Sequence, residues 1–144
     1  MEITSDHNSP AIDWQRLADL LELSGLNKRH LPTLELAFTR SQFRYFGYIG
    51  DELVAAARAI SDFTTVSYVC DVAIHPDYQG QGYGKVLMQR IMQDLTPLGK
   101  VIIYAVPDKI DFYKKFGFNP LLTAMIHVSE ENLIRMQKTG YIPQ

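Results

Sequence analysis

Residues 75–85 read HPDYQGQGYGK, and in this stretch three glycines alternate with larger residues between a proline and a lysine. Glycine loses more conformational entropy on folding than any other residue, so this arrangement needs a physical reason. The stretch follows TTVSYVCDVAI, whose β-branched residues predict a strand over 64–74, and it runs into a helical pattern that begins at Gly82. A glycine-rich turn between a strand and a helix is a typical ligand-binding place in an α/β sheet.

The start of this helix predicts an anion site. Amides in a first helical turn have no partner inside the helix and lie at the positive end of its dipole. Glycine lets a diphosphate approach those amides without meeting a Cβ, and Lys85 adds a positive charge. Two other phosphate loops are excluded. A Walker loop would need glycine at Gln79 and Ser or Thr at Val86, and the dinucleotide pattern would need glycine at Lys85 or Leu87.

The remaining pattern predicts a mixed α/β sheet covered by helices. Apolar periodicity indicates two helices before residue 42, the first ended by Gly25 and the second begun near Pro32. The other expected elements are a hairpin over 43–49 and 53–61, a short buried strand over 100–106, a helix over 109–116 closed by Gly117, a last strand over 121–128, and a short helix after Ser129.

Length and composition indicate one globular domain over 1–144. Apolar residues make up 47% of the chain and charged residues 21%, and the formal net charge of -2 provides no basic field for nucleic acid or an anionic membrane. Cys70 is the single cysteine, which excludes an internal disulfide and a two-cysteine metal site. No signal pattern and no spanning run of about 18 apolar residues is present. We therefore expect a cytoplasmic protein with no metal, nucleic-acid or membrane partner.

Two motifs carry a resemblance to the GNAT superfamily of N-acetyltransferases. The segment DVAIHPDYQGQGYGKVLMQRIM resembles its acetyl-coenzyme A segment, and Gln79, Gly82 and Gly84 meet the pattern Gln/Arg-x-x-Gly-x-Gly/Ala. FYKKFGF, residues 112–118, is similar to the second signature, Phe-Tyr-x-x-x-Gly-Phe. The resemblance implies a mixed, mostly antiparallel sheet of about six to seven strands with about four helices. It also implies transfer of an acetyl group from acetyl-coenzyme A to a primary amine.

The resemblance implies how the coenzyme would bind. The strand residues Val72, Ala73 and Ile74 would bond the pantetheine amides through their backbone. The strands beginning near Tyr68 and Val101 would splay apart and open a slot for the thioester. The residues that would cradle the pyrophosphate are Gln79, Gly80, Gln81, Gly82, Tyr83, Gly84 and Lys85.

Two catalytic residues are expected. Tyr113 aligns with a tyrosine that in many GNAT enzymes protonates the departing thiolate, and the alternative is that it only packs its helix. Asp71 is a candidate general base, because a carboxylate on a central strand is uncommon unless it is paired or used. A partly solvated structural aspartate, or a water relayed from a β-bulge, remains an equal alternative for Asp71.

Other reactive residues receive weaker expectations. Cys70 is expected to be a small buried residue rather than a nucleophile, and His75 a surface residue. His127 lies in the expected last strand, from which it could reach an acceptor. Val106 stands where family members often carry an asparagine that contacts the coenzyme, so that contact is expected to be missing.

The resemblance implies that residues 24–48 line the acceptor, which is expected to be a small-molecule primary amine. The motifs resemble both arylalkylamine (serotonin) and glucosamine-phosphate acetyltransferases. The aromatic residues of FTRSQFRYFGY favour an apolar amine, whereas Arg40 and Arg44 favour an anionic one. Three alternatives stay open: a coenzyme-A-binding module without turnover, a protein N-acetyltransferase, and a non-acyl phosphate-binding domain. TAMIHV, residues 123–128, has the apolar content for a homodimer contact.

Overall fold

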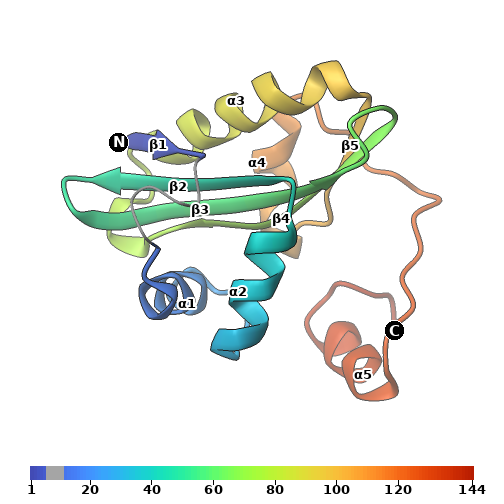
Figure 1. Ribbon diagram of the computed structural model, residues 1–144. Helices are drawn as coiled ribbons and strands as arrows, with labels where there is room; N and C mark the ends of the chain where they lie inside the picture. The colour runs from blue at the N-terminus through green and yellow to red at the C-terminus, as the bar shows by residue number, and fades with distance from the viewer. Residues whose placement is uncertain (6–11) are drawn as a thin grey trace. The chain divides into compact units, whose positions relative to one another are not determined.

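A five-stranded sheet in the order β1-β2-β3-β4-β5 forms the centre of the computed structural model, which describes residues 1–5 and 12–144 (Figure 1). Strands β1 to β4 pair antiparallel, and β5 pairs parallel to β4. This confirms a mixed, mostly antiparallel α/β fold. The elements are β1 (Glu2–Thr4), α1 (Trp14–Leu23), α2 (Leu31–Arg40), β2 (Phe43–Ile49), β3 (Glu52–Ser61), β4 (Val66–Ile74), α3 (Tyr83–Leu95), β5 (Lys100–Ile102), α4 (Ile110–Lys114) and α5 (Glu130–Lys138).

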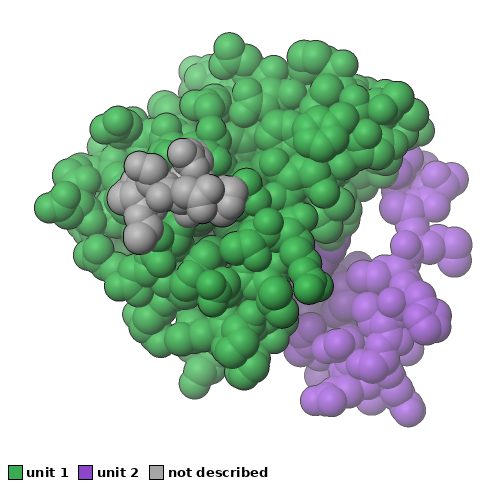
Figure 2. Space-filling view, viewed as in Figure 1, with its two compact units in different colours: residues 1–103 green, residues 104–144 purple. Residues whose placement is uncertain are grey.

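The chain divides into two compact units, residues 1–103 and 104–144, coloured separately in Figure 2. The first unit holds the whole sheet with α1, α2 and α3. The second holds α4 and α5. The single domain over 1–144 that the sequence indicates stays a prediction.

Local sequence signals explain where α1 and α2 begin and end. Asp13 caps α1 by accepting a hydrogen bond from the Arg16 amide, and Gly25 ends it at φ +99°. Pro32 lies in the first turn of α2, where its missing N–H costs nothing. The Arg44 guanidinium then donates to three carbonyls at the end of α2, at 2.7 to 3.4 Å. Arg44 therefore caps a helix.

Helices cover both faces of the sheet, because both faces of β2 are apolar. The buried Tyr45 hydroxyl donates to Asp94 on α3 at 2.9 Å, and burial raises the pKa of Tyr45. The next residue, Phe46, packs its ring 5.8 Å from that of Phe38 on α2. Figure 1 shows α3 on one face of the sheet and α1 and α2 on the other. Alternation along β2 thus sends successive side chains into two different cores.

The larger core lies between the sheet and α1 and α2. Trp14 packs against it with its ring 6.4 Å from that of Phe38, as expected of a packing anchor. Complete burial of a leucine side chain in this core stabilises the fold by about 1.5–3 kcal/mol. The buried members are Leu17, Ala18, Leu20, Leu21, Leu34, Phe38, Phe46, Leu53, Ala56 and Ala73.

The parallel pair β4–β5 is short and depends on one glycine. Pairing runs from Val66 opposite Lys100 to Tyr68 opposite Ile102. Gly99, at φ +107°, brings the chain so close to Thr65 that a Cβ would collide with the Thr65 carbonyl oxygen. That carbonyl accepts the Lys100 amide at 3.1 Å.

Replacement of Gly99 by alanine is therefore expected to lower the free energy of unfolding by at least about 2 kcal/mol, since both the backbone and the contact are strained. Urea unfolding measures the loss. Gly50→Ala is the matched control, because Gly50 also has positive φ (+58°), but no atom of a described residue lies within 4 Å of the place where a Cβ would stand. We expect a loss of about 1 kcal/mol there. Equal losses at the two sites would contradict the close approach at Gly99.

The structure corrects two expectations. The last strand over 121–128 is wrong: these residues form no strand and pair with no described strand, and Leu122 and Met125 are 95% and 98% exposed. Apolar content alone cannot make a strand without a partner. The described sheet therefore has five strands instead of six to seven. It includes the unexpected β1, which is too short to leave a pattern. The homodimer contact proposed for 123–128 stays a prediction without its strand.

The second unit is organised by aromatic contacts around α4. The Tyr113 ring lies 5.1 Å from Phe112 and 6.0 Å from Phe118. Gly117 ends the segment at φ +87°, as its place in the sequence predicts. Ser129 caps α5 by accepting a hydrogen bond from the Asn132 amide. Both expected helices of this unit are thus present.

Candidate active site

An open edge of β4 forms the first part of the site. The pairing of β4 with β5 ends at Tyr68 opposite Ile102, although β4 itself continues to Ile74. The edge from Val69 to Ile74 therefore extends past the last β4–β5 pair. Because β5 itself ends at Ile102, the slot expected between the strands beginning near Tyr68 and Val101 stays a prediction.

A β-bulge interrupts β4 on its other edge, where it pairs with β3. Arg58 is opposite Cys70 and Ala56 is opposite Ala73, so two residues of β4 face one residue of β3. Asp71 takes up the extra length at φ +56°, a left-handed backbone that is uncommon outside glycine. Bulges re-aim side chains and are frequent next to active sites.

Beyond the bulge, backbone groups are directed toward the open edge. The His75 amide donates to the Val54 carbonyl of β3 at 2.8 Å. Successive residues of a strand direct their backbone groups to opposite sides, so those of Ile74 point away from β3. The Gln79 side chain donates to the Ile74 carbonyl at 2.9 Å. Ala73 is buried, and its neighbours Val72 and Ile74 are half-buried.

The glycine loop joins this edge directly to α3. Gly80 and Gly82 adopt φ +77° and +87°, and no atom of a described residue lies within 4 Å of the place where a Cβ would stand. The N-cap of α3, which starts at Tyr83, is Gly82, which has no side chain that could cap the first turn. Lys85 lies exposed in that turn. The loop thus presents uncapped amides and a cation in open space, an arrangement suited to a phosphate.

The loop is braced by its own side chains. The Gln81 side chain donates to the Asp77 carbonyl at 3.1 Å, and the Tyr78 hydroxyl donates to Glu52 at 2.6 Å. The ring of Tyr83 lies 6.2 Å from that of Tyr78. The expected coenzyme residues from 72 to 85 thus form one continuous strand, loop and helix start.

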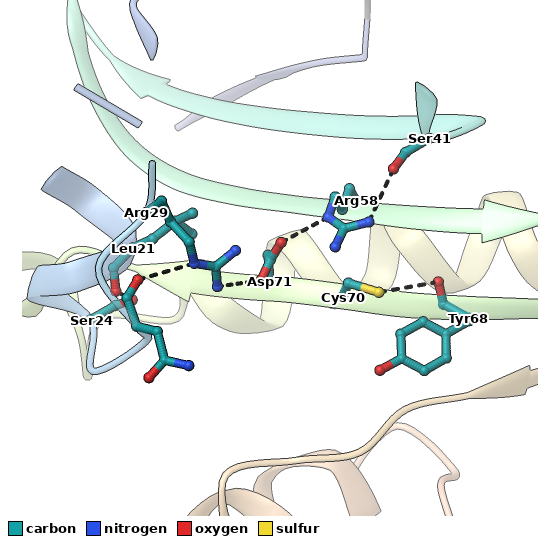
Figure 3. Close-up of polar contacts among 9 residues, drawn as sticks. Leu21, Ser24, Arg29, Ser41, Arg58, Tyr68, Cys70 and Asp71 are labelled. Carbon is teal, nitrogen blue, oxygen red and sulfur yellow. Dashed lines mark hydrogen bonds and ion pairs between the residues drawn. The ribbon is translucent and has the colours of Figure 1, made fainter. Parts of the chain in front are cut away.

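At the bulge, Asp71 pairs with two arginines from distant parts of the chain. Figure 3 shows its carboxylate between Arg29, from the α1–α2 loop, and Arg58, from β3; each guanidinium lies 2.7 Å from one of its oxygens. Arg58 also donates to Ser41 at 3.3 Å and lies 5.8 Å from the centre of the Phe38 ring. The cluster therefore lies on the face of the sheet that α1 and α2 cover.

The electrostatics of the cluster bear on the role of Asp71. Burial alone would raise the pKa of Asp71, but hydrogen bonds from Arg29 and Arg58, together with their charges, outweigh it and hold the pKa below its usual range. The carboxylate is therefore ionised at neutral pH, and each oxygen already accepts a guanidinium. This arrangement weakens the case for Asp71 as a general base and favours the alternative, a water at the bulge.

Sequence reasoning missed Arg29 and Arg58. A signal for one of them was present: Arg58 interrupts the apolar strand LVAAARAIS, and Asp71 is the only charged residue of the next strand. Charged residues on central strands are usually paired, and these two strands follow one another in an antiparallel sheet. A contact between Arg58 and Asp71 could therefore be expected from the sequence. Arg29 lies in a loop and left no comparable pattern.

The other candidates, Cys70, His75 and His127, do not lie in surroundings that would make them reactive. Burial raises the pKa of the Cys70 thiol to about 11, which keeps it protonated and unreactive. The half-buried His75 caps the turn Pro76–Tyr78 by accepting a hydrogen bond from the Asp77 amide. His127 is exposed in the segment that forms no strand. These observations give neither Cys70 nor His75 a catalytic setting.

Tyr113 belongs to the second unit. Its side chain is buried, and this burial raises its pKa to about 12, so the hydroxyl keeps its proton at neutral pH. A protonated phenol can act only as an acid.

In the described part of the chain, no three His, Cys, Asp or Glu side chains are grouped so that they could hold a metal ion. Within residues 1–5 and 12–144, no helix is long and apolar enough to cross a membrane.

Residues 10–118 match the model of the acetyltransferase (GNAT) family. The chain belongs to this family. The match includes both motifs of the sequence, the bulged strand and α4.

Similar proteins agree with this assignment. The uncharacterized N-acetyltransferase ycf52 of Porphyra purpurea is 35% identical over 118 residues, which cover 77% of this chain and 67% of that protein. The histone acetyltransferase TAP1 of Glycine max is 30% identical over 120 residues, covering 74% and 52%. Thus the chain spans about two thirds or less of the curated relatives it matches. A solved structure from meticillin-resistant Staphylococcus aureus, SA2161, described as a probable acetyltransferase, has a TM-score of 0.79 at 25% identity, covering 89% of this chain and 98% of that one.

Proposed function

We propose that this protein transfers the acetyl group of acetyl-coenzyme A to the primary amine of a small molecule, by direct attack within a ternary complex. The observation that carries the proposal is the bulged strand β4, whose open edge runs straight into an uncapped glycine loop. An extended chain of amides fits such an edge by strand addition, and a diphosphate fits the loop.

The coenzyme is a substrate that the edge of β4 and the glycine loop would hold by its pantetheine amides and its pyrophosphate. Val72, Ala73 and Ile74 form the edge proposed for the pantetheine amides, where the backbone groups of Ile74 point away from β3, and Gly80 and Gly82 let the pyrophosphate approach the amides of α3. Lys85 contributes a charge there. The side chain of Gln79 already occupies the Ile74 carbonyl, so it has to turn away or share that carbonyl when the pantetheine binds.

The chemistry needs a base for the ammonium, polarisation of the carbonyl and an acid for the thiolate. Tyr113 is proposed as the acid, because its raised pKa keeps the hydroxyl protonated at neutral pH, so that it can donate to the departing thiolate as negative charge develops on the sulfur. For the base we favour a water at the bulge over Asp71, whose oxygens are both engaged. Asp71 would then act by fixing the bulge.

A protein acceptor is the second candidate, and the name of the Glycine max relative supports it. We favour a small molecule because the motifs resemble arylalkylamine and glucosamine-phosphate acetyltransferases and the net charge is mildly negative. The cytoplasmic location and the homodimer stay predictions.

The test is thiol release from acetyl-coenzyme A with arylalkylamines, amino sugars, amino acids, polyamines and a lysine-rich peptide as acceptors. Release with one small-molecule class supports the proposal. Release with the peptide alone supports the protein acetyltransferase. Tight coenzyme binding with no transfer to any acceptor supports a binding module without turnover.

The loop geometry gives a separate prediction. Replacement of Gly82 by alanine is expected to weaken coenzyme binding about tenfold, because a Cβ strains the left-handed backbone and intrudes on the approach of the phosphates. Calorimetry with coenzyme A measures the change. Gly25→Ala is the matched control: Gly25 has a similar φ (+99°) and open surroundings at the end of α1. Both variants should lose similar stability. Equal affinities in both would refute the proposed phosphate loop.

A further inference from the structure

The cluster at the bulge carries more positive than negative charge. Arg29 and Arg58 share one carboxylate, Asp71, and the three side chains are 24%, 16% and 9% exposed. The neighbourhood therefore holds two cations and one anion, partly removed from water. A surplus charge in such a place favours an additional anion.

Arg29 is the cation of the cluster that has unused hydrogen-bond donors. Its Nη2 donates to Asp71 at 2.7 Å and its Nε to the Asn27 carbonyl at 3.0 Å. A guanidinium carries more N–H donors than these bonds use, and the Nη1 group of Arg29 makes no hydrogen bond to any residue that the structure describes. Arg58 is more enclosed and is also tied to Ser41. Any anion that joins the cluster from solvent therefore meets Arg29 first.

The position of the cluster links the two substrates. Arg29 belongs to the loop between α1 and α2, within the segment 24–48 expected to line the acceptor. Its partner Asp71 immediately precedes Val72, where the proposed coenzyme edge begins. The coenzyme phosphates have their own place in the glycine loop, beyond the end of β4. The surplus charge at the bulge is therefore available to the acceptor.

We propose that the acceptor is an amine that also carries an anionic group, and that Arg29 binds this group beside the Asp71 bulge. The inference rests on the proposed acetyl transfer and narrows its substrate class. A carboxylate and a phosphate share the chemistry that a guanidinium fork recognises. Asp71 keeps Arg29 extended toward the strand, so that the anion and the amine are held in one orientation.

The experiment uses acceptor pairs that differ only in the anionic group: tyramine and tyrosine, tryptamine and tryptophan, glucosamine and glucosamine 6-phosphate. We expect kcat/KM for the member with the anionic group to exceed that for the member without it by about tenfold or more in at least one pair. The first two pairs report on a carboxylate and the third on a phosphate. Equal or reversed values in all three pairs overturn the proposal, even if transfer itself is observed.

Variants assign the preference to Arg29. Arg29→Gln is expected to abolish it and Arg29→Lys to reduce it, because lysine keeps the charge but loses the fork. Lys138→Gln is the control, since it removes the same charge from an exposed residue outside the segment 24–48 and should keep the preference. Thermal melting establishes that each variant folds, and Arg29→Lys carries the test if Arg29→Gln does not. A preference that survives both Arg29 variants overturns the proposal.

A binding measurement separates this inference from the proposed function. Calorimetry titrates each pair into protein loaded with coenzyme A, which needs no turnover. If no amine is acetylated but tyrosine, tryptophan or glucosamine 6-phosphate binds in an Arg29-dependent manner, the anion site stands and the proposed transfer falls. If no anionic member binds and none is acetylated, both fall.

Discussion

Replacement of Tyr113 by phenylalanine is expected to lower kcat at least about a hundredfold while the coenzyme Kd stays unchanged, since a positioned acid typically contributes that much. The hydroxyl is the only group removed. Its proton would otherwise neutralise the thiolate as the bond to the acetyl carbon breaks. Steady-state kinetics measures kcat, and calorimetry with coenzyme A measures the coenzyme Kd.

The burial of Tyr113 sharpens this prediction. Because burial raises its pKa to about 12, the acid form persists over the whole usual assay range. The wild-type rate should therefore show no alkaline loss from Tyr113 until the pH comes near its pKa of about 12. Moreover, a buried hydroxyl gives little stability unless it is hydrogen-bonded, so the variant should melt at or near the wild-type temperature.

Tyr141→Phe is the matched control, because Tyr141 lies in the same unit, is half-buried and also has a pKa raised by burial. It should keep the full rate. A Tyr113→Phe variant with wild-type kcat would leave Tyr113 as a packing residue of α4, the alternative that the sequence also allowed.

The part of the fold that depends on local signals was predictable. Helix α1 starts at a capping aspartate and ends at a glycine with positive φ, and the hairpin turns at Gly50. Each of these signals acts within a few residues, so the sequence alone contains it. The glycine loop belongs to the same class, because a strand, two left-handed glycines and a helix start follow one another along the chain.

The parts that failed depend on distant partners. Residues 121–128 have the apolar content of a strand, but a strand exists only when another one pairs with it. The Arg29–Asp71 contact joins residues far apart in sequence through a bulge whose position no local pattern marks. A carboxylate on a central strand marks Asp71 as unusual, but no local pattern identifies the residues that pair with it.

Asp71 also carries the largest expected effect on stability. Asp71→Asn is expected to lower the free energy of unfolding by about 3 kcal/mol, because it leaves two half-buried guanidinium groups without their shared anion. Urea unfolding at pH 7 measures the loss. Asp19→Asn is the control: its exposed carboxylate accepts a hydrogen bond from Gln15, and the change should stay within about 0.5 kcal/mol. Arg29→Met added to Asp71→Asn should recover part of the loss, since one unpaired charge is removed.

The same variant decides the role of Asp71 in catalysis. If a water at the bulge is the base, Asp71→Asn lowers kcat through a displaced bulge, but the acidic limb of the pH–rate profile keeps its midpoint. If Asp71 is the base, that limb disappears with the carboxylate. A vanished limb in a variant that still binds coenzyme A would restore Asp71 as the base and overturn our preference for water.

The pH dependence of stability tests the ion pairs independently of turnover. The folded-state pKa of Asp71 lies below its value in the unfolded chain, so its contribution is present in full above about pH 4 and is lost as the pH falls through the folded pKa. The stability difference between wild type and Asp71→Asn should therefore be constant from pH 7 to about pH 5 and shrink on further acidification. High salt should reduce it only slightly, because the pairs are largely shielded from solvent. A difference that persists undiminished at pH 2 would mean that Asp71 stabilises the bulge by its shape and left-handed backbone, and that the two arginines do not depend on its charge.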